Sequence, residues 1–262
     1  LVRDRKDTVR CFHNVCRHRA TIVLQKPEKG LSNLQCPYHA WTWDLEGNLK
    51  ATPYFDGTPN SENFQVDPKE NALVPVRCSV WNHVVFINIE GNAPPLEEYV
   101  APAAKQYSCF DLDAMELGHR IEWEYEANWK LVIENQRECY HCPTKHQGYA
   151  EIQLDTDLDD ADKQDLIESR QDACRQKLSS LGLDTSLVDP SYRMSGPWWR
   201  VSRTPFRRGA VCETLDGQPA APLMGGFTDP DVGNARANTY PNFWLHGSSD
   251  HMHTVRVTPI AL

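Results

Sequence analysis

Two short motifs near the start of this 262-residue chain constrain its fold more than any other feature. Cys16-Arg17-His18 is followed, after seventeen residues, by Cys36-Pro37-Tyr38-His39, so each motif offers one thiolate and one imidazole. Around them, apolar and polar residues alternate over short runs that are separated by turn signals, a pattern typical of strands in a small β domain. These runs cover residues 9–14, 34–37, 40–45 and 84–89. The first part of the chain is therefore predicted to be all β, with the motifs on its loops.

The pairing of ligand types within each motif indicates which metal centre these loops hold. Two Cys and two His can bind one structural zinc ion tetrahedrally, and this remains the alternative. Common zinc fingers, however, keep the Cys pair and the His pair on separate elements, whereas each loop here contributes one of each. A Rieske centre needs that mixed pairing, because both thiolates bind one iron and both imidazoles bind the other. The sequence thus predicts a [2Fe-2S] cluster held by Cys16, His18, Cys36 and His39.

Residues 138–146 (ECYHCPTKH) form a second candidate metal site. Asn128 is a favourable N-cap, and it predicts a helix that continues to about position 142, where Pro143 ends it. Histidines five residues apart do not share a face on an ideal helix, so the break at Pro143 is needed to turn His146 toward His141. The pair would then supply two ligands of a 2-His-1-carboxylate iron site, with two ordinary histidines at a helix end as the alternative.

The cysteines beside these histidines require a separate interpretation. Cys139 and Cys142 have the C-x-x-C spacing of a redox pair, but no thioredoxin-like βαβ pattern surrounds them, so we interpret them as packing residues. The chain has nine cysteines in all, without the density of a small disulfide scaffold. Cysteines that are spread along the chain in this way indicate a reducing compartment, and we expect a cytoplasmic protein.

Together these segments resemble the Rieske non-haem iron oxygenases. Residues 13–19 (HNVCRHR) and 36–47 (CPYHAWTWDLEG) resemble the Rieske domain of that family. Residues 128–142 (NWKLVIENQRECYHC) are most similar to its glycine betaine monooxygenases, within the subgroup that acts on quaternary ammonium compounds. The resemblance implies an α+β protein, with an all-β Rieske domain followed by a catalytic domain of helices on an antiparallel sheet. It also implies two cofactors, a [2Fe-2S] cluster and an Fe(II) ion bound by His141 and His146.

A domain boundary is predicted at Gly91-Asn92-Ala93-Pro94-Pro95, which places the Rieske domain in residues 1–92 and the mononuclear iron domain in residues 93–262. The second domain is predicted to be mixed. We expect helices over 96–107 and from 155 to about 181, a strand over 119–126, and further strands from Trp198 onward. The chain begins within a hairpin-like pattern and stops after a strand-like one, so both domains are expected to be truncated.

The role of Glu138 and the identity of the third iron ligand are implied by the resemblance alone. Many family members have an aspartate at the position of Glu138, which links the cluster histidine of a neighbouring subunit to an iron ligand. Glu138 is thereby implied to relay electrons from His39 of a neighbour to His141. The family's third ligand is an Asp beyond the last strands, so it is expected outside this chain, and the fragment is expected to be inactive. We interpret the remaining acidic candidates as the start of a helix, where its dipole favours them: Asp155, Asp157, Asp159, Asp160 and Asp162.

The implied activity is that of the oxygenase component of a Rieske monooxygenase. It would hydroxylate an N-methyl group of a quaternary ammonium compound such as glycine betaine and release formaldehyde, using O2 and electrons from NAD(P)H through a reductase. The family implies a homotrimer. Two alternatives remain, an aromatic-ring-hydroxylating dioxygenase alpha subunit and a Rieske ferredoxin with a fused domain. Iron content distinguishes the ferredoxin, with two irons per chain against three for an intact oxygenase.

Charge and hydropathy limit the partners further. The chain carries 27 Lys and Arg against 36 Asp and Glu, and its net charge of −9 disfavours nucleic acid or an anionic membrane as the main partner. No apolar stretch is long enough to span a membrane. A buried quaternary ammonium group would need an aromatic or acidic cage. The candidates, each of which has core packing as its alternative, are Tyr149, Trp198, Trp199, Phe206 and Trp244.

Overall fold

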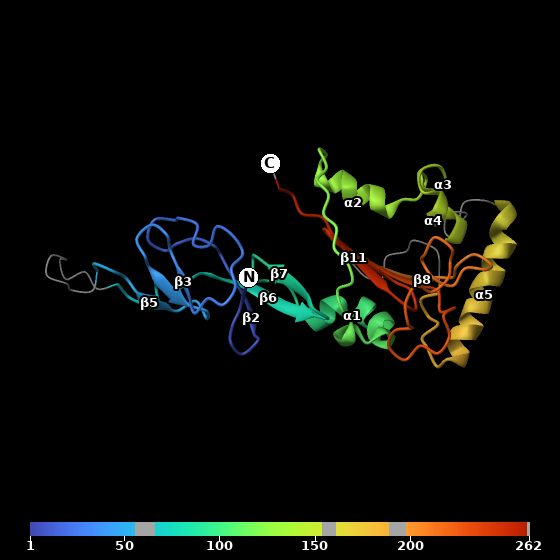
Figure 1. The fold of residues 1–262 in the computed structure, drawn as a ribbon, viewed down its shortest axis with the longest axis horizontal. Coiled ribbons are helices and arrows are strands. Elements are labelled where there is room, and N and C mark those ends of the chain that lie inside the picture. The colour runs from blue at the N-terminus through green and yellow to red at the C-terminus, as the bar shows by residue number, and fades with distance from the viewer. Residues whose placement is uncertain (56–65, 154–160, 189–197, 261–262) are drawn as a thin grey trace. The chain divides into compact units, whose positions relative to one another are not determined.

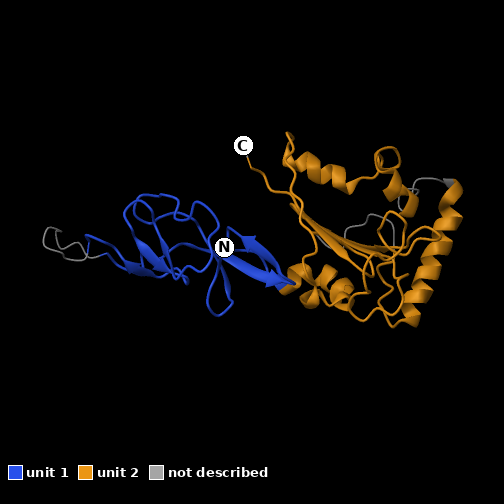
Figure 2. Ribbon diagram, in the orientation of Figure 1, with its two compact units in different colours: residues 1–96 blue, residues 97–262 orange. Residues whose placement is uncertain are grey.

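The computed structural model describes residues 1–55, 66–153, 161–188 and 198–260 and divides into two compact units, Leu1–Leu96 and Glu97–Leu262 (Figure 2). The first unit consists of β-strands, and in Figure 1 its described loops connect two antiparallel sheets. One sheet has the order β1-β2-β6-β7, and the other has the order β3-β4-β5. Their bounds are β1 Val2–Arg3, β2 Val9–Phe12, β3 Asn33–Gln35, β4 Thr42–Asp44, β5 Leu49–Ala51, β6 Pro75–Trp81 and β7 Val84–Asn88.

The core of this unit lies under the three-stranded sheet. Trp43, in the middle of β4, is fully buried, and its indole Nε1 donates a hydrogen bond to the carbonyl oxygen of Asn71 at 2.9 Å. Gly47 forms the turn from β4 to β5 at φ +87°, and a Cβ there would lie 2.5 Å from the Phe12 ring. The predicted alternating runs are confirmed as β2, β3, β4 and β7, each within a few residues of its expected bounds.

The second unit is built on one antiparallel sheet with the strand order β11-β10-β9-β8. Its strands are β8 Trp199–Thr204, β9 Asn234–Thr239, β10 Phe243–Gly247 and β11 Met252–Arg256. Helices and shorter 3-10 turns surround it, namely α1 Leu96–Tyr107, η1 Ser108–Phe110, η2 Leu112–Ala114, α2 Trp129–Arg137, α3 Cys142–Lys145, α4 Gln147–Ile152, η4 Ala161–Lys163 and α5 Gln164–Ser180. The predicted α+β class is confirmed by this arrangement.

The two faces of this sheet have different roles because side chains alternate along each strand. On one face the Tyr107 hydroxyl of α1 lies 2.8 Å from the carbonyl oxygen of Ala235 and 3.0 Å from that of Leu245, so α1 covers the sheet there. The other face carries Arg236 and His246, which are register partners on β9 and β10. Both line a large cavity together with residues of α2. In Figure 1, α1 and α2 lie on opposite sides of the sheet.

Two of the predicted helices require correction at their ends. The helix from the Asn128 cap is α2, but it stops at Arg137 rather than near position 142, and Glu138 is already extended at φ −117° and ψ 154°. Pro143 does not end this helix. It occupies the first turn of the separate helix α3, where a missing N–H costs nothing. The helix predicted from residue 155 is seen as α5 from Gln164, while residues 154–160 lie outside the described part.

The strand predicted over residues 119–126 is wrong, because this segment has no regular secondary structure. Its alternating apolar side chains are largely exposed, with Trp123 at 66% and Tyr125 at 65% of their full accessible area. A strand needs a hydrogen-bonded neighbour, and none of the four described strands of the second unit pairs with this segment. Alternation in the sequence was therefore not sufficient to form a strand here.

Candidate active site

Two loops with the same backbone hydrogen bonds present the first motif pair. The amide of Cys16 donates to the carbonyl oxygen of Thr21 at 2.8 Å, and the amide of Cys36 donates to that of Trp41 at 2.9 Å. In each loop, the alanine four residues after the cysteine donates its amide to the carbonyl oxygen of that cysteine. Both alanines have a positive φ, 58° for Ala20 and 57° for Ala40. The loops are thus two copies of one turn, which points a cysteine inward and a histidine outward.

All four predicted ligands are brought together by these turns. Cys16 and Cys36 are buried at 4% and 2% exposure and lie in contact. Burial raises the pKa of the Cys16 thiol, although the amide of His18 opposes this, and the nearby Cys36 raises it further. The rings of His18 and His39 lie 4.7 Å apart, centroid to centroid, and His39 is the more exposed of the two.

The surroundings of His18 fit a cluster at this place. Its ring stacks on Trp41 at 5.0 Å, with the two planes 8° apart, so the ring is held in one orientation. Its Nδ1 is buried without a hydrogen-bond partner in the described part of the chain, which is costly unless the nitrogen binds something else. Two buried thiols beside two oriented imidazoles are the donor set of a Rieske centre.

The second histidine pair lies just after α2, in the other unit. The end of α2 is fixed by the sheet, because Arg200 of β8 donates to the carbonyl oxygen of Arg137 at 3.2 Å, and the Arg137 guanidinium lies 3.9 Å from the centre of the Tyr240 ring. His141 then precedes α3 and His146 follows it, so one short helix brings their rings to 5.1 Å, centroid to centroid. Sequence reasoning expected this convergence.

The cysteines that flank His141 differ from the interpretation given to them above. Cys139 and Cys142 are joined by a disulfide in this structure, so they are more than packing residues. The bond closes the turn that carries His141. The sequence signal was their C-x-x-C spacing, and the absence of a thioredoxin-like pattern led us to dismiss it wrongly.

Glu138 contacts His141 by a route that differs from the one expected. The helix predicted to about position 142 would have held both residues, but Glu138 is extended and its carboxylate reaches back through the turn. Its Oε1 lies 2.6 Å from His141 Nδ1, and its Oε2 accepts from the Tyr140 amide at 2.7 Å. The hydrogen bond from His141 lowers the pKa of Glu138, so the carboxylate is ionised at neutral pH. Because Nδ1 is engaged, the opposite nitrogen of His141 is the one oriented for a metal.

The third iron ligand remains a prediction. In the described part of the chain no carboxylate forms a three-residue ligand group with His141 and His146. Of the acidic residues that were considered and set aside, Asp162 is exposed. The others lie outside the described residues, namely Asp155, Asp157, Asp159 and Asp160.

An open cavity of about 2270 Å³ lies between the sheet and the segments around α2. His141, His146 and Glu138 line it. Two of the five residues considered for an aromatic cage, Tyr149 and Trp244, also line it, and their role in a cage stays a prediction. The other three cage candidates are not among its lining residues: Trp199 and Phe206 are buried in the core, and Trp198 is exposed elsewhere.

Three further residues of this cavity were missed by sequence reasoning. Glu213, His246 and His253 lie close enough to form a group of potential metal ligands. His246 and His253 are opposite each other in the register of β10 and β11. Their equal spacing on either side of the turn Ser-Ser-Asp-His at 248–251 was the available signal, but nothing near Glu213 linked it to them.

Comparisons with known proteins agree with both halves of this geometry. A family model for the ring hydroxylating alpha subunit (catalytic domain) matches residues 112–261, and one for the Rieske [2Fe-2S] domain matches residues 1–64. The glycine betaine monooxygenase oxygenase subunit of Chromohalobacter salexigens is 32% identical over 99% of this chain and 56% of its own length. The corresponding subunit of Pseudomonas aeruginosa is 31% identical over 100% of this chain and 59% of its own length. The chain thus spans little more than half of these relatives.

A solved structure supports the fold. A quaternary ammonium Rieske monooxygenase in complex with L-carnitine matches 97% of this chain and 55% of its own chain, at a TM-score of 0.61 and 22% identity. None of the helices in the described segments is both long and apolar enough to cross a membrane.

Proposed function

Since this chain belongs to the Rieske oxygenase alpha subunits, we propose that it is part of an oxygenase component that hydroxylates an N-methyl group of a quaternary ammonium compound such as glycine betaine. The observation that carries the proposal is the pairing of His141 and His146 at a large cavity, with Glu138 hydrogen-bonded to His141. The fold also supplies the four residues suited to a [2Fe-2S] cluster.

Each metal group has a defined place in this proposal. Cys16, His18, Cys36 and His39 hold the cluster, and His141 and His146 hold the mononuclear iron. When bound, the cluster supplies one-electron transfer and the iron supplies dioxygen activation. The third iron ligand is a carboxylate outside this chain. Glu138 fixes the ring orientation of His141 through Nδ1, as second ligand shells do in other metal sites.

Glu138 also has the position of an electron relay between subunits of a homotrimer. Its carboxylate is 47% exposed, so one side is accessible while the other side is bonded to His141. His39 is likewise exposed at the tip of its loop. We infer that His39 of one subunit approaches Glu138 of the next, which gives a path of hydrogen bonds from cluster to iron.

Tyr149 and Trp244 are the proposed aromatic contacts of the substrate cation. A quaternary ammonium group has no N–H to donate, so it is bound by aromatic faces and by charge. Both residues line the cavity that holds the histidine pair. The relatives that act on glycine betaine, at 31 and 32% identity, support this substrate class.

The proposed reaction balances with one dioxygen, two electrons and two protons. One oxygen atom enters a C–H bond of the N-methyl group, and the other leaves as water after it takes up two protons and two electrons, which arrive from NAD(P)H through a reductase. The C–N bond of the hydroxymethyl product then breaks to give formaldehyde, a tertiary amine and a proton.

Formaldehyde release by the full-length protein with a reductase tests the proposal. Glycine betaine, proline betaine, carnitine and choline are the substrates to compare, with the His146→Asn variant as the control that lacks an iron ligand. We expect stoichiometric formaldehyde and demethylated amine from at least one of the four. Conversion of naphthalene to a diol, without formaldehyde from any of the four, would instead support the aromatic-ring dioxygenase.

A further inference from the structure

Glu213, His246 and His253 form a compact group on the cavity-facing side of the sheet. His246 of β10 and His253 of β11 are direct register partners, so their side chains leave the same face of the sheet, and their ring centroids are 4.8 Å apart. Glu213 arrives from the segment between β8 and β9, and its Oε2 lies 4.0 Å from His246 Nδ1. One ligand atom from each residue lies within 4.8 Å of the other two.

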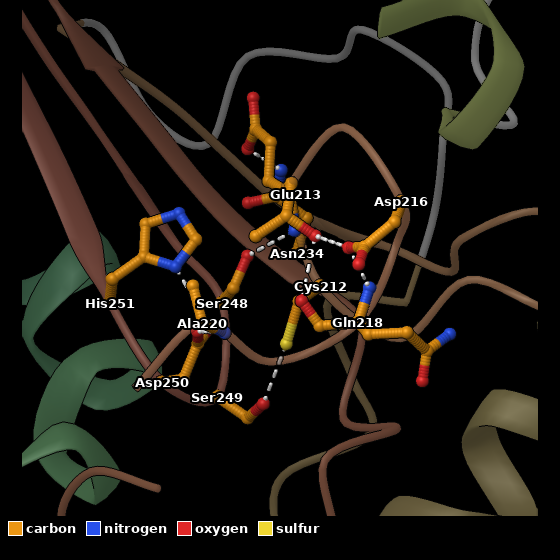
Figure 3. Close-up of polar contacts among 11 residues, drawn as sticks. Cys212, Glu213, Asp216, Gln218, Ala220, Asn234, Ser248, Ser249, Asp250 and His251 are labelled. Carbon is orange, nitrogen blue, oxygen red and sulfur yellow. Dashed lines mark hydrogen bonds and ion pairs between the residues drawn. The ribbon is translucent and has the colours of Figure 1, made fainter. Parts of the chain in front are cut away.

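The backbone around Glu213 is held by a network of polar contacts (Figure 3). Its amide donates to the Ser248 hydroxyl at 3.1 Å, and Asn234 of β9 donates to its Oε2. The neighbouring Cys212 thiol lies 3.2 Å from the Ser249 hydroxyl. Asn234 of β9 therefore holds the carboxylate, and the loop after β10 holds the backbone beside it. Such preorganisation is what a ligand set needs, because little order remains to be gained on binding.

The protonation of the group suits a cation. Burial would raise the pKa of Glu213, but the nearby His246, 4.0 Å away, and the charge of Arg236 hold this pKa at about 2, so the carboxylate is ionised. Burial and the adjacent His246 lower the pKa of His253 to about 4, so its imidazole is neutral. An ionised carboxylate and a neutral imidazole are the forms that bind metals.

Arg236 is the nearest competing cation, because it is the register partner of His246 on β9. Its guanidinium donates to the Tyr149 hydroxyl at 2.8 Å and to Gln153 Oε1 at 2.7 Å. These bonds direct it toward α4. The two imidazoles and the open cavity beside Glu213 leave room for a metal ion.

We infer that Glu213, His246 and His253 form a site for a divalent transition-metal ion such as Zn²⁺, separate from the iron pair His141 and His146. Two nitrogens and one carboxylate oxygen suit that class of metal and leave a position open toward the cavity. Ligands about 2.1 Å from a tetrahedral zinc are roughly 3.4 Å apart, so the side chains need to close by no more than about 1.4 Å.

Zinc binding to a protein that lacks the iron pair tests this inference. The full-length protein with His141→Asn and His146→Asn is dialysed against Zn²⁺, and bound zinc is measured by mass spectrometry. We expect about one zinc per chain beyond any held elsewhere, and at least about a 100-fold weaker affinity after Glu213→Gln or His253→Asn is added. His251→Asn and Asp216→Asn are the matched controls, a histidine and a carboxylate of the same loops, and should leave zinc unchanged.

Either of two results overturns the site. One is absence of zinc from the His141→Asn, His146→Asn protein, and the other is equal affinity in the presence and absence of Glu213→Gln and His253→Asn. If these two added variants fail to fold, anomalous scattering at the zinc edge from crystals of the double variant locates the ion directly. A zinc peak away from the three residues, or none, would refute the inference. Since both iron histidines are absent, the result does not depend on the proposed function.

Discussion

At the scale of single residues, the proposed function gives the Glu138 carboxylate two roles, orienting His141 and relaying electrons. Replacing it with Gln keeps the size of the side chain but removes the charge beside His141 Nδ1. In the full-length trimer we expect both metal centres to stay loaded and the cluster to stay reducible, while product formation falls by about 10- to 100-fold or more. Product formation and iron content are the measurements.

Glu134→Gln is the matched control for this change, because Glu134 lies on the exposed side of α2 one turn earlier. It should leave turnover unchanged. Normal turnover in Glu138→Gln, at normal iron content, would remove Glu138 from the mechanism and weaken the relay between subunits with it.

Cys36 carries a second prediction at this scale. Serine in its place has nearly the same volume, but its hydroxyl stays protonated and is a poor iron ligand. We expect Cys36→Ser to lose the visible absorption and the electron paramagnetic resonance of the reduced cluster. Cys78→Ser is the control, since Cys78 lies on β6 with its thiol 3.6 Å from the carbonyl oxygen of Val9. An intact cluster signal in Cys36→Ser would contradict the ligand set.

At the scale of elements, the cavity depends on how closely η1 packs against the loop before β9. Gly225 has a φ of +52°, and a Cβ there would lie 2.3 Å from the carbonyl oxygen of Cys109 and 3.0 Å from the carbonyl carbon of Phe110. Gly225→Ala therefore needs backbone movement, and we expect it to lower the free energy of unfolding by about 1–3 kcal/mol.

The adjacent Gly226 gives a matched control, because a Cβ there meets nothing within 4 Å. Gly226→Ala should change the free energy of unfolding by less than about 0.5 kcal/mol in the same denaturant titration. Similar losses in the two variants would show that the contact with η1 is not the cause.

At the scale of the whole molecule, the proposed relay makes each active site depend on two subunits. Homotrimers of Cys36→Ser lack the cluster, and homotrimers of His141→Ala lack the iron, so neither should turn over. Mixed trimers from equal amounts of the two chains should recover about a quarter of normal activity, because half of the chains hold iron and each iron has an even chance of a neighbour with a cluster in a heterologous ring.

Formaldehyde release after co-expression or subunit exchange measures this recovery. The physical mixture of the two homotrimers, without exchange, is the control and should stay inactive. If electrons instead passed within one chain, the mixed trimers would be as inactive as their parents.

The sequence by itself determined the parts that depend on neighbouring residues. The predicted ligands Cys16 and His18, and likewise Cys36 and His39, lie within single tight turns, so their spacing already contains the geometry of each loop. The same is true of the N-cap Asn128, whose side chain accepts from the Lys130 amide at 3.0 Å, and of the histidines on either side of α3. Local hydrogen bonds fix these features whatever the rest of the chain does.

Only the tertiary structure decided the features that depend on segments far apart in the sequence. The helix after Asn128 ends at Arg137, where Arg200 of β8 binds the carbonyl oxygen of its last residue. Residues 119–126 alternate like a strand but pair with none of the described strands. Glu213 meets His246 and His253 only in the folded chain. The register of β10 and β11 sets which of their side chains face the cavity, and a shift of one residue would turn the side chains of the shifted strand to the opposite face.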